Sequence, residues 1–286
     1  MLPMQPLQAT IATSVEASGV GLHSGQPARV ALKPAPEHHG LVFYRMDLPD
    51  TPGVPAHFEN VVNTTLATTL GTDKATVATV EHLIAALAGS RLDNVRVEVH
   101  GPELPIMDGS ARPWMLLLAE AGREDQTAAA PRVVIRKPVE VRDGDRVARL
   151  IPSDTLQIAA TIDFTHPLIG RQSLETPLSN GEFGRELAWA RTFGFEAQVA
   201  AMHDAGLGLG GSLENAVIYG EDEVLNPEGL RAPDEAIRHK LLDIVGDLGL
   251  LGARLQGRLE AERPGHAITL ELLRALLGAP DAFVRE

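Results

Sequence analysis

The sequence contains no cysteine, although it is 286 residues long. Disulfide bonds, thiolate zinc sites, iron–sulfur clusters and a cysteine nucleophile are therefore excluded. Any metal ion must be held by histidine, aspartate or glutamate side chains. The lack of cysteine is also compatible with the reducing cytoplasm, which is the compartment we expect.

Basic residues are scarce relative to acidic ones, with 25 lysines and arginines against 38 aspartates and glutamates, a net charge of −13. A field of this sign disfavours nonspecific nucleic-acid binding, so we expect no nucleic-acid partner. An anionic substrate would need a local cluster of basic residues. The sequence also has no apolar run long enough to span a bilayer and no signal-peptide pattern at its start. No obligate protein partner is evident.

Hydrophobic residues make up 44% of the chain and charged residues 22%, the ordinary balance of a soluble globular protein. This length can bury a substantial core in one large domain or in two of ordinary size. We expect the first helix to be capped by Thr79 and to stop at Gly89. Periodicity predicts strands at 28–32, 41–44, 95–99, 133–135, 147–151, 156–162 and 216–219, and helices at 76–88, 114–121, 236–248 and 267–277.

Residues 124–131 are small and polar and end in a proline, which makes them the best candidate for a linker. On both sides of this segment strands come first and helices later. That order favours two α+β domains of similar plan over one doubly wound sheet. No repeat is visible in the sequence, so the similarity rests on element order alone. We predict an N-terminal domain over 1–127 and a C-terminal domain over 128–286.

The strongest local signal for chemistry is the pair His239 and Asp243 in a predicted helix. Four residues apart, the two side chains share one helix face and could bind one zinc ion. The alternative is an amphipathic helix whose polar face happens to pair a histidine with an aspartate. On spacing alone that alternative is the commoner outcome. The pair becomes suggestive because a third ligand is available elsewhere.

The third ligand could be His82, which follows Glu81 at the head of the first helix. A carboxylate beside a ligand suits hydrolysis, because zinc acidifies its bound water and a nearby glutamate can take the proton. The arrangement is not the HExxH motif, because Ile84 stands three residues beyond Glu81. The alternative is a glutamate favoured by the helix dipole beside an ordinary histidine.

His266 precedes the last apolar helix and could act as a protonated general acid, or it could be a satisfied cap residue. Glycine-rich segments at 19–21, 107–110 and 206–212 match neither the phosphate loop of a kinase nor a dinucleotide fingerprint. A phosphotransferase is therefore disfavoured. The histidines at 38, 39, 57, 100, 166 and 203 are interpreted as structural or surface residues.

Taken together, these segments resemble one family, the UDP-3-O-acyl-N-acetylglucosamine deacetylases. They run in the family's order through nearly the whole chain, which makes the set far more specific than any single motif. The matching stretches are GVGLHSG (19–25), TVEHLIAALAG (79–89), PIMDGSA (105–111), HPLIGRQ (166–172), ARTFGF (190–195), GLGLGGSLENA (206–216), LNPEGL (225–230) and RHKLLDIVGDL (238–248), with Asp93-Asn94 and Gly265-His266.

The resemblance implies two similar α+β domains with the active site at their interface. It implies zinc-dependent (Zn2+) hydrolysis of the N-acetyl group of UDP-3-O-acyl-N-acetylglucosamine, which releases acetate in the committed step of lipid A biosynthesis. The competing hypotheses are a catalytically weak relative and a zinc-containing protein that only binds a sugar nucleotide or a lipid.

The resemblance also assigns roles to individual residues. It implies that zinc is bound by His82, His239 and Asp243. Glu81 would be the general base and His266 the general acid, oriented by Asp247. Thr192 would hydrogen-bond the developing oxyanion.

The substrate would meet Lys240 at its polar head and Phe193 at its sugar. Arg263 stands where the family usually has lysine, so its charge could serve the diphosphate, while Pro264 and Thr269 depart from the usual pattern. An apolar passage for the 3-O-acyl chain would be lined by Val199, Gly210, Gly211, Ser212, Ala216 and Ile218, for which ordinary core packing is the alternative.

Overall fold

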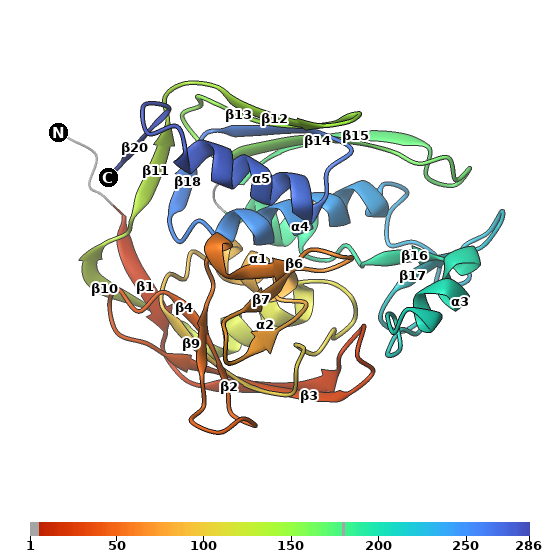
Figure 1. Ribbon diagram of the computed structural model, residues 1–286, viewed down its shortest axis with the longest axis horizontal. Helices are drawn as coiled ribbons and strands as arrows, with labels where there is room; N and C mark the ends of the chain where they lie inside the picture. Colours follow the sequence, from red (N-terminus) through yellow and green to blue (C-terminus); the bar gives the residue numbers. More distant parts are fainter. Residues whose placement is uncertain (1–5, 179–180) are drawn as a thin grey trace.

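The computed structural model describes residues 6–178 and 181–286, and these residues form four layers. Two five-stranded sheets lie outermost, and two layers of helices lie between them (Figure 1). The first sheet contains β2 (Val15–Val20), β3 (Pro27–Pro34), β9 (Val95–His100), β4 (Leu41–Arg45) and β5 (Gly53–Pro55). The second contains β12 (Val139–Asp143), β13 (Arg146–Ile151), β19 (Arg258–Glu262), β14 (Gln157–Asp163) and β15 (Arg171–Pro177).

The two sheets have the same strand order and the same strand directions. In the first, β9 pairs antiparallel with β3 and parallel with β4. In the second, β19 pairs antiparallel with β13 and parallel with β14. The predicted α+β class with two similar halves is therefore confirmed in its topology. The domain limits of 1–127 and 128–286 stay a prediction.

The strands form where the sequence alternates. In β3 and β9 every second side chain is buried, and the buried faces consist of valine, leucine and alanine. Such a period-two pattern places one face of a sheet on the core and the other in solvent. The helices α1 (Glu81–Gly89), α2 (Arg112–Ala121), α4 (Glu235–Gly249) and α5 (His266–Leu277) cover these buried faces.

Helices α1 and α4 pack directly against each other at the centre of the molecule. Residues 81–87 of α1 are all buried, as expected of a helix that is covered on every side. Two glycines of α4 permit the close approach. A Cβ atom on Gly246 would lie 2.3 Å from the Glu81 carbonyl oxygen, and one on Gly249 would lie 2.4 Å from Ile84 Cγ2.

The start of α1 differs from the prediction, because the helix begins at Glu81 and not at residue 76. Thr76 and Val77 form the short strand β8, and Thr79 has a φ of 57° and does not cap the helix. β-branched residues favour extended backbone, and a left-handed residue cannot continue into a helix. The predictions for 114–121, 236–248 and 267–277 are confirmed.

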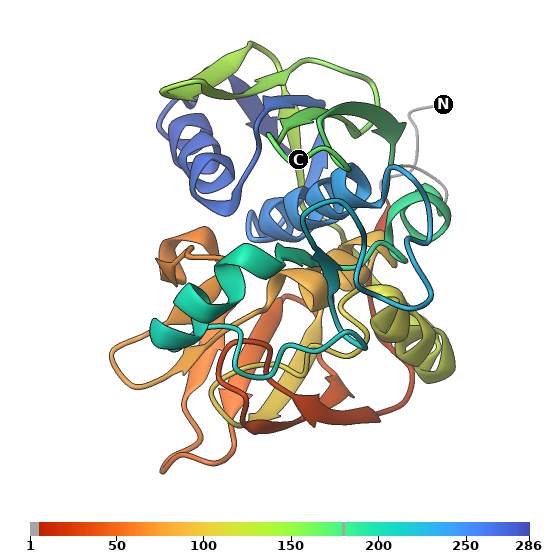
Figure 2. The ribbon, with the colours of Figure 1, turned by 90° about the vertical axis from the view of Figure 1, so that its right-hand side faces the viewer.

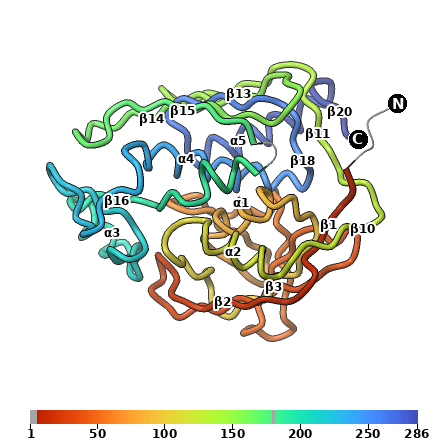
Figure 3. The backbone as a smooth tube through the Cα atoms, turned by 180° about the vertical axis from the view of Figure 1, so that it is seen from behind, coloured from red at the N-terminus to blue at the C-terminus, as the bar shows by residue number. Residues whose placement is uncertain are grey.

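The proposed linker at 124–131 is also corrected. Residues Arg123–Ala129 form strand β10, which pairs antiparallel with β1 (Leu7–Ile11). Seen from behind, β1 and β10 run side by side from the first sheet toward the second (Figure 3). The prediction failed because β10 is largely exposed to solvent and carries polar residues like those of a loop.

Between β15 and α4 the chain builds a lobe at one end of the layers (Figure 1). Helix α3 (Glu196–Asp204) has no buried residue and contacts β16 (Phe193–Phe195), which pairs parallel with β17 (Val217–Tyr219). Figure 2 looks at the molecule from the side of this lobe. Within residues 6–178 and 181–286, no helix has the length and apolar character that a membrane crossing requires.

The remaining short elements complete the edges of these layers. A three-stranded sheet consists of β6 (Val61–Asn63), β7 (Thr69–Gly71) and β8 (Thr76–Val77). Another consists of β18 (Arg254–Gln256), β11 (Arg132–Ile135) and β20 (Phe283–Arg285). The helical turns are η1 (Phe58–Asn60) and η2 (Phe183–Leu187).

Candidate metal centre and active site

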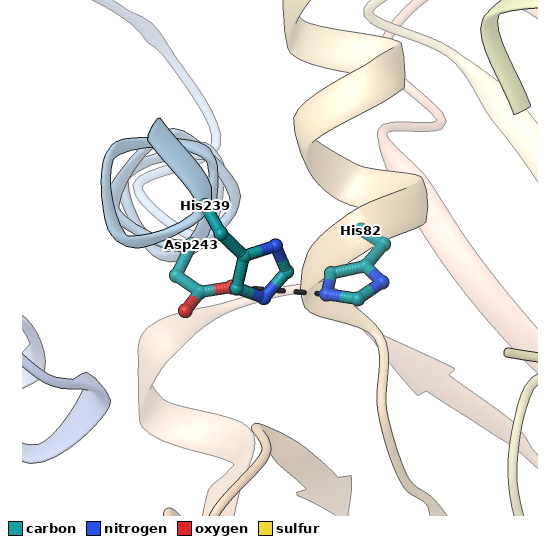
Figure 4. Close-up of side chains that lie close together, drawn as sticks. All are labelled: His82, His239 and Asp243. Carbon is teal, nitrogen blue, oxygen red and sulfur yellow. Dashed lines mark ion pairs between the residues drawn. The ribbon is translucent and has the colours of Figure 1, made fainter. Parts of the chain in front are cut away.

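His82 on α1 faces His239 and Asp243 on α4, so three residues that could hold a metal ion meet from both halves of the chain (Figure 4). The Asp243 Oδ1 atom lies 3.7 Å from His82 Nε2 and 3.3 Å from His239 Nε2. One ligand atom from each side chain lies within 4.8 Å of the others, and all three residues are buried. The close packing of α1 on α4 therefore creates the cluster.

The spacing of these atoms fits a divalent metal ion. Tetrahedral zinc bonds of about 2.0–2.1 Å separate the ligand atoms by about 3.4 Å. The His239 Nδ1–H donates to the Ala190 carbonyl at 3.1 Å, which leaves Nε2 as the ligand atom. Burial and the neighbouring His239 lower the pKa of His82 to about 3, and burial also lowers the pKa of His239. Both imidazoles are therefore neutral, as metal ligation requires.

Asp243 is ionised in this setting. Burial alone would raise its pKa, but His239 and Lys240 hold the pKa of that carboxyl well below its usual range. The Lys240 Nζ atom donates to Asp243 Oδ2 at 2.6 Å, and Oδ1 is turned toward the histidines. The predicted contact of Lys240 with the polar head of the substrate stays a prediction.

Glu81 lies next to His82 at the first turn of α1 and is fully enclosed. Burial raises the pKa of Glu81. The charge of His266 lowers this pKa and the charge of Asp243 raises it further, so the pKa reaches about 7. The Thr68 backbone N–H donates to Glu81 Oε2 at 3.1 Å. A carboxyl group with a pKa near neutrality suits a general base.

His266 occupies the first position of α5 and is paired with Asp247 of α4. Its Nδ1 atom lies 2.8 Å from Asp247 Oδ2, and both side chains are buried. Burial alone would lower the pKa of His266, but the Asp247 carboxylate outweighs it and raises the pKa to about 9. A buried imidazolium at neutral pH is a proton donor, so the structure brings a donor and an acceptor to one metal-binding cluster.

The start of β16 and the residue before it lie beside His239. The Phe193 ring lies 6.3 Å from the His239 ring in an edge-on arrangement, and Lys240 Nζ lies 5.8 Å from the Phe193 ring centre. Thr192 is half-buried, and its backbone donates to Gly109 and accepts from Val217.

An ion pair that sequence reasoning missed anchors this segment. Arg191 is 2% exposed and Glu235, at the first position of α4, is 1% exposed. The Arg191 Nε atom donates to Glu235 Oε1 at 2.9 Å, and its backbone N–H donates to the same oxygen. The pair therefore ties the segment that carries Thr192 to the helix that carries His239 and Asp243. No signal in the linear sequence distinguishes this arginine from a surface one.

The family pattern of UDP-3-O-acyl N-acetylglycosamine deacetylases (LpxC) matches residues 8–278. The chain belongs to this deacetylase family. A deacetylase of this name from Anaeromyxobacter sp. (strain Fw109-5) is 50% identical over 273 residues, which cover 96% of this chain and 89% of that protein. Another from Myxococcus xanthus (strain DK1622) is 48% identical and covers 99% of this chain and 90% of that protein. One from Xanthomonas campestris pv. campestris (strain B100) is 46% identical, with coverages of 96% and 92%.

In this deacetylase-family chain, the residues predicted to line an acyl passage gather in the lobe of α3, β16 and β17. The loop after α3 is held by the first sheet's Gly-rich turn, because Leu209 and Gly210 donate backbone hydrogen bonds to the carbonyls of His23 and Leu22. Val199 is half-buried on α3, Gly210, Gly211 and Ser212 lie in that loop, and Ala216 and Ile218 lie at β17. The lining role of these residues stays a prediction.

Arg263 lies in the turn between β19 and α5. Its guanidinium group pairs with Asp145 and, at 2.9 Å, with Asp163. A diphosphate would have to compete with these two carboxylates for the same cation. The prediction that Arg263 binds the substrate therefore gains no support from these contacts.

A group of aromatic rings beside Phe193 was not anticipated from the sequence. The Phe164 ring lies 5.6 Å from the Phe193 ring, and the His166 ring lies 5.3 Å from the Phe195 ring. The His166 Nε2–H donates to the Gly220 carbonyl at 2.6 Å. Burial raises the pKa of the nearby Tyr219 to about 12. The rings come from the loop after β14 and from strands β16 and β17, which are far apart in the sequence, so no local pattern revealed the group.

Proposed function

We propose that this chain hydrolyses the N-acetyl group of UDP-3-O-acyl-N-acetylglucosamine and releases acetate in lipid A biosynthesis, with zinc as its metal ion. One observation carries the proposal. In a chain of the deacetylase family, a two-histidine, one-aspartate cluster lies beside a buried carboxyl of raised pKa and a buried imidazolium.

The donor set matches zinc in its catalytic use. His82, His239 and Asp243 supply two imidazole nitrogens and one carboxylate oxygen, a combination that catalytic zinc sites employ with one position left for water or substrate. Bound there, zinc would polarise the amide carbonyl and make the attacking water more acidic.

Glu81 is the proposed general base. The Thr68 backbone N–H occupies its Oε2 atom, so its other carboxylate oxygen can take the proton from the attacking water. A pKa of about 7 allows this group to be ionised at the start of the reaction and to hold the proton afterwards.

His266 is the proposed general acid. Its Nδ1–H is held by Asp247, which turns Nε2–H toward the substrate side, and the pKa of about 9 keeps the ring charged at neutral pH. The ring donates its proton to the departing glucosamine nitrogen. The Thr192 hydroxyl donates a hydrogen bond to the carbonyl oxygen as negative charge develops on it.

The substrate would lie across the lobe and the metal-binding cluster. We propose that Phe193 contacts the sugar and that Lys240 meets the polar head, because both side chains adjoin His239. The acyl chain would follow the lobe of α3, β16 and β17. A cytoplasmic setting accords with a chain that has no cysteine.

The test measures acetate release from the UDP-linked substrate together with bound metal for the wild type and matched variants. His82→Ala is expected to lose zinc and turnover together. Glu81→Gln is expected to keep zinc and to lose kcat by about 10²–10⁴-fold, because it removes only the base. His100→Ala changes an exposed histidine at the end of β9 and serves as the control.

Two outcomes would contradict the proposal. Full activity of Glu81→Gln would remove the assigned base. A wild type that binds zinc through His82 yet releases no acetate would favour a protein that only binds a sugar nucleotide or a lipid.

A further inference from the structure

Thr68 lies between the two carboxylates on which the proposed proton transfers depend. Its backbone N–H donates to Glu81 Oε2 at 3.1 Å, and its hydroxyl donates to Asp247 Oδ1 at 2.8 Å. The residue is 0% exposed. One threonine therefore contacts both the proposed base of the N-terminal half and the partner of the proposed acid in the C-terminal half.

We propose that Thr68 is a positioning residue that sets the orientation of the general base and of the general acid at the same time. The inference rests on the roles proposed above for Glu81 and His266. Thr68 itself does not reach the reacting atoms and acts through its two carboxylate partners.

Thr68 holds one oxygen of each carboxylate, Asp247 and Glu81, and leaves the other oxygen of each to a partner in the proposed reaction. On Asp247, Oδ1 accepts from Thr68 and Oδ2 accepts from His266 Nδ1. Both oxygens are thus engaged, and the plane of the carboxylate is set. On Glu81, the Thr68 N–H fixes Oε2 and leaves the other oxygen for the attacking water. Groups that hold a reacting side chain in this way are as important for geometry as the side chain itself.

The fold keeps Thr68 in this place from both directions. Its carbonyl accepts the backbone N–H of Val80 at 3.3 Å, immediately before α1 begins. The next residue, Thr69, is the first residue of β7. All three polar groups of Thr68 are therefore paired, and the hydroxyl is the one that crosses from the N-terminal half to α4.

Removal of the hydroxyl should disturb orientation without removing either proton-transfer group. Thr68→Val keeps the side-chain shape and the backbone N–H, but it leaves Asp247 Oδ1 buried without this donor. The Asp247–His266 pair can then rotate. Loss of an outer hydrogen-bond partner at a metal site typically costs about 10–100-fold in activity, and we expect a loss of this size in kcat. KM should stay within about twofold of the wild type, because Thr68 does not touch the substrate.

The experiment compares kcat, KM, bound metal and thermal unfolding for Thr68→Val, Thr68→Ser and Thr69→Val. Thr68→Ser retains the hydroxyl and should recover kcat to within about threefold of the wild type. Thr69→Val makes the same substitution at the neighbouring position. Because successive side chains of extended backbone point to opposite sides, the Thr69 side chain points away from that of Thr68, and its substitution should leave kcat unchanged. If Thr68→Val does not fold, Thr68→Ala takes its place, because it also lacks the hydroxyl.

Wild-type kcat in a folded, metal-loaded Thr68→Val or Thr68→Ala protein would overturn the inference. So would equal losses in the Ser and Val variants, because the hydroxyl would then not be the active feature. Glu81→Gln and His266→Gln in the same assay separate the two proposals. If they are inactive while Thr68→Val is fully active, only the role of Thr68 fails. If Glu81→Gln and His266→Gln are fully active, the proposed proton transfers fail, and the role of Thr68 fails with them.

Discussion

Replacement of Gly246 by alanine tests whether the packing of α1 on α4 sets the metal-binding geometry. A Cβ atom at this position would lie 2.3 Å from the Glu81 carbonyl oxygen and 3.0 Å from Glu81 Cα. These are backbone atoms and cannot rotate away. Ordinary contact requires about 3.4 Å, so the two helices must separate or slide by about 1 Å.

The expected effect on folding is small, and the expected effect on the site is large. Overpacking costs about 1–3 kcal/mol, but the exchange of glycine for alanine inside a helix returns about 1 kcal/mol. The free energy of unfolding should therefore fall by at most about 2 kcal/mol. Metal–ligand distances are tolerated to about 0.2 Å, and a misplacement of about 1 Å can cost about 100-fold in rate. His82 moves with α1 while His239 and Asp243 move with α4, so the cluster must open.

The assay measures zinc affinity by competition with a chelator, kcat for acetate release, and unfolding in urea. The matched control is Gly278→Ala at the end of α5, where a Cβ atom would meet its nearest neighbour at 3.4 Å. We expect Gly246→Ala to lose metal affinity and kcat while Gly278→Ala keeps both. If Gly246→Ala binds zinc and turns over like the control, the helix contact does not set the geometry.

Three further variants test the site. Asp247→Asn removes the charge that raises the pKa of His266 against the effect of burial. The ring then loses its proton at a lower pH, so the alkaline limb of the kcat/KM profile should move to lower pH. An alkaline limb that does not move would contradict the pairing of His266 with Asp247. Thr192→Val should lower kcat by about 10²–10³-fold with KM nearly unchanged if its hydroxyl stabilises the oxyanion, and a pure KM effect would exclude that role. Arg191→Met leaves Glu235 buried without its cation and should lower the free energy of unfolding by about 3–5 kcal/mol in urea titrations; a loss below 1 kcal/mol would show that water reaches the pair.

Periodic segments of the sequence were enough to predict much of the fold. The strands at 28–32 and 95–99 and the helices at 236–248 and 267–277 carry clear periods, and the structure places them within one or two residues. In such segments local pattern and burial agree, because one face of each element lies on the core. The order of these elements also predicted two α+β halves.

Elements without a buried face could not be predicted in this way. The polar strand β10 has a loop-like composition and is extended only because β1 pairs with it. Thr79 adopts a left-handed backbone, and its hydroxyl donates to Glu103 Oε1 at 2.7 Å. That contact joins residues from separate elements, so the local sequence indicated a helix cap instead.

The metal-binding cluster was found because two of its members lie one helical turn apart. The separation of His239 and Asp243 is visible in the sequence, and His82 was a candidate third ligand because it follows Glu81 at the head of a predicted helix. The resemblance made this set specific and supplied the roles of the neighbouring residues. Thr68 gave no such signal. Its partners Glu81 and Asp247 belong to different halves, and only the folded chain shows that one hydroxyl reaches across.

The position of the cluster also has a consequence for the chain as a polymer. With His82 on one helix and His239 and Asp243 on the other, a bound ion would close a long loop of the polypeptide, much as a disulfide bond does in secreted proteins. The tightness of that closure would follow the concentration of free ion in the cell, because an ion that binds only the native state stabilises it by mass action. Metal scarcity would thus weaken the link between the two halves. A chain without its metal ion would be inactive and also easier to degrade.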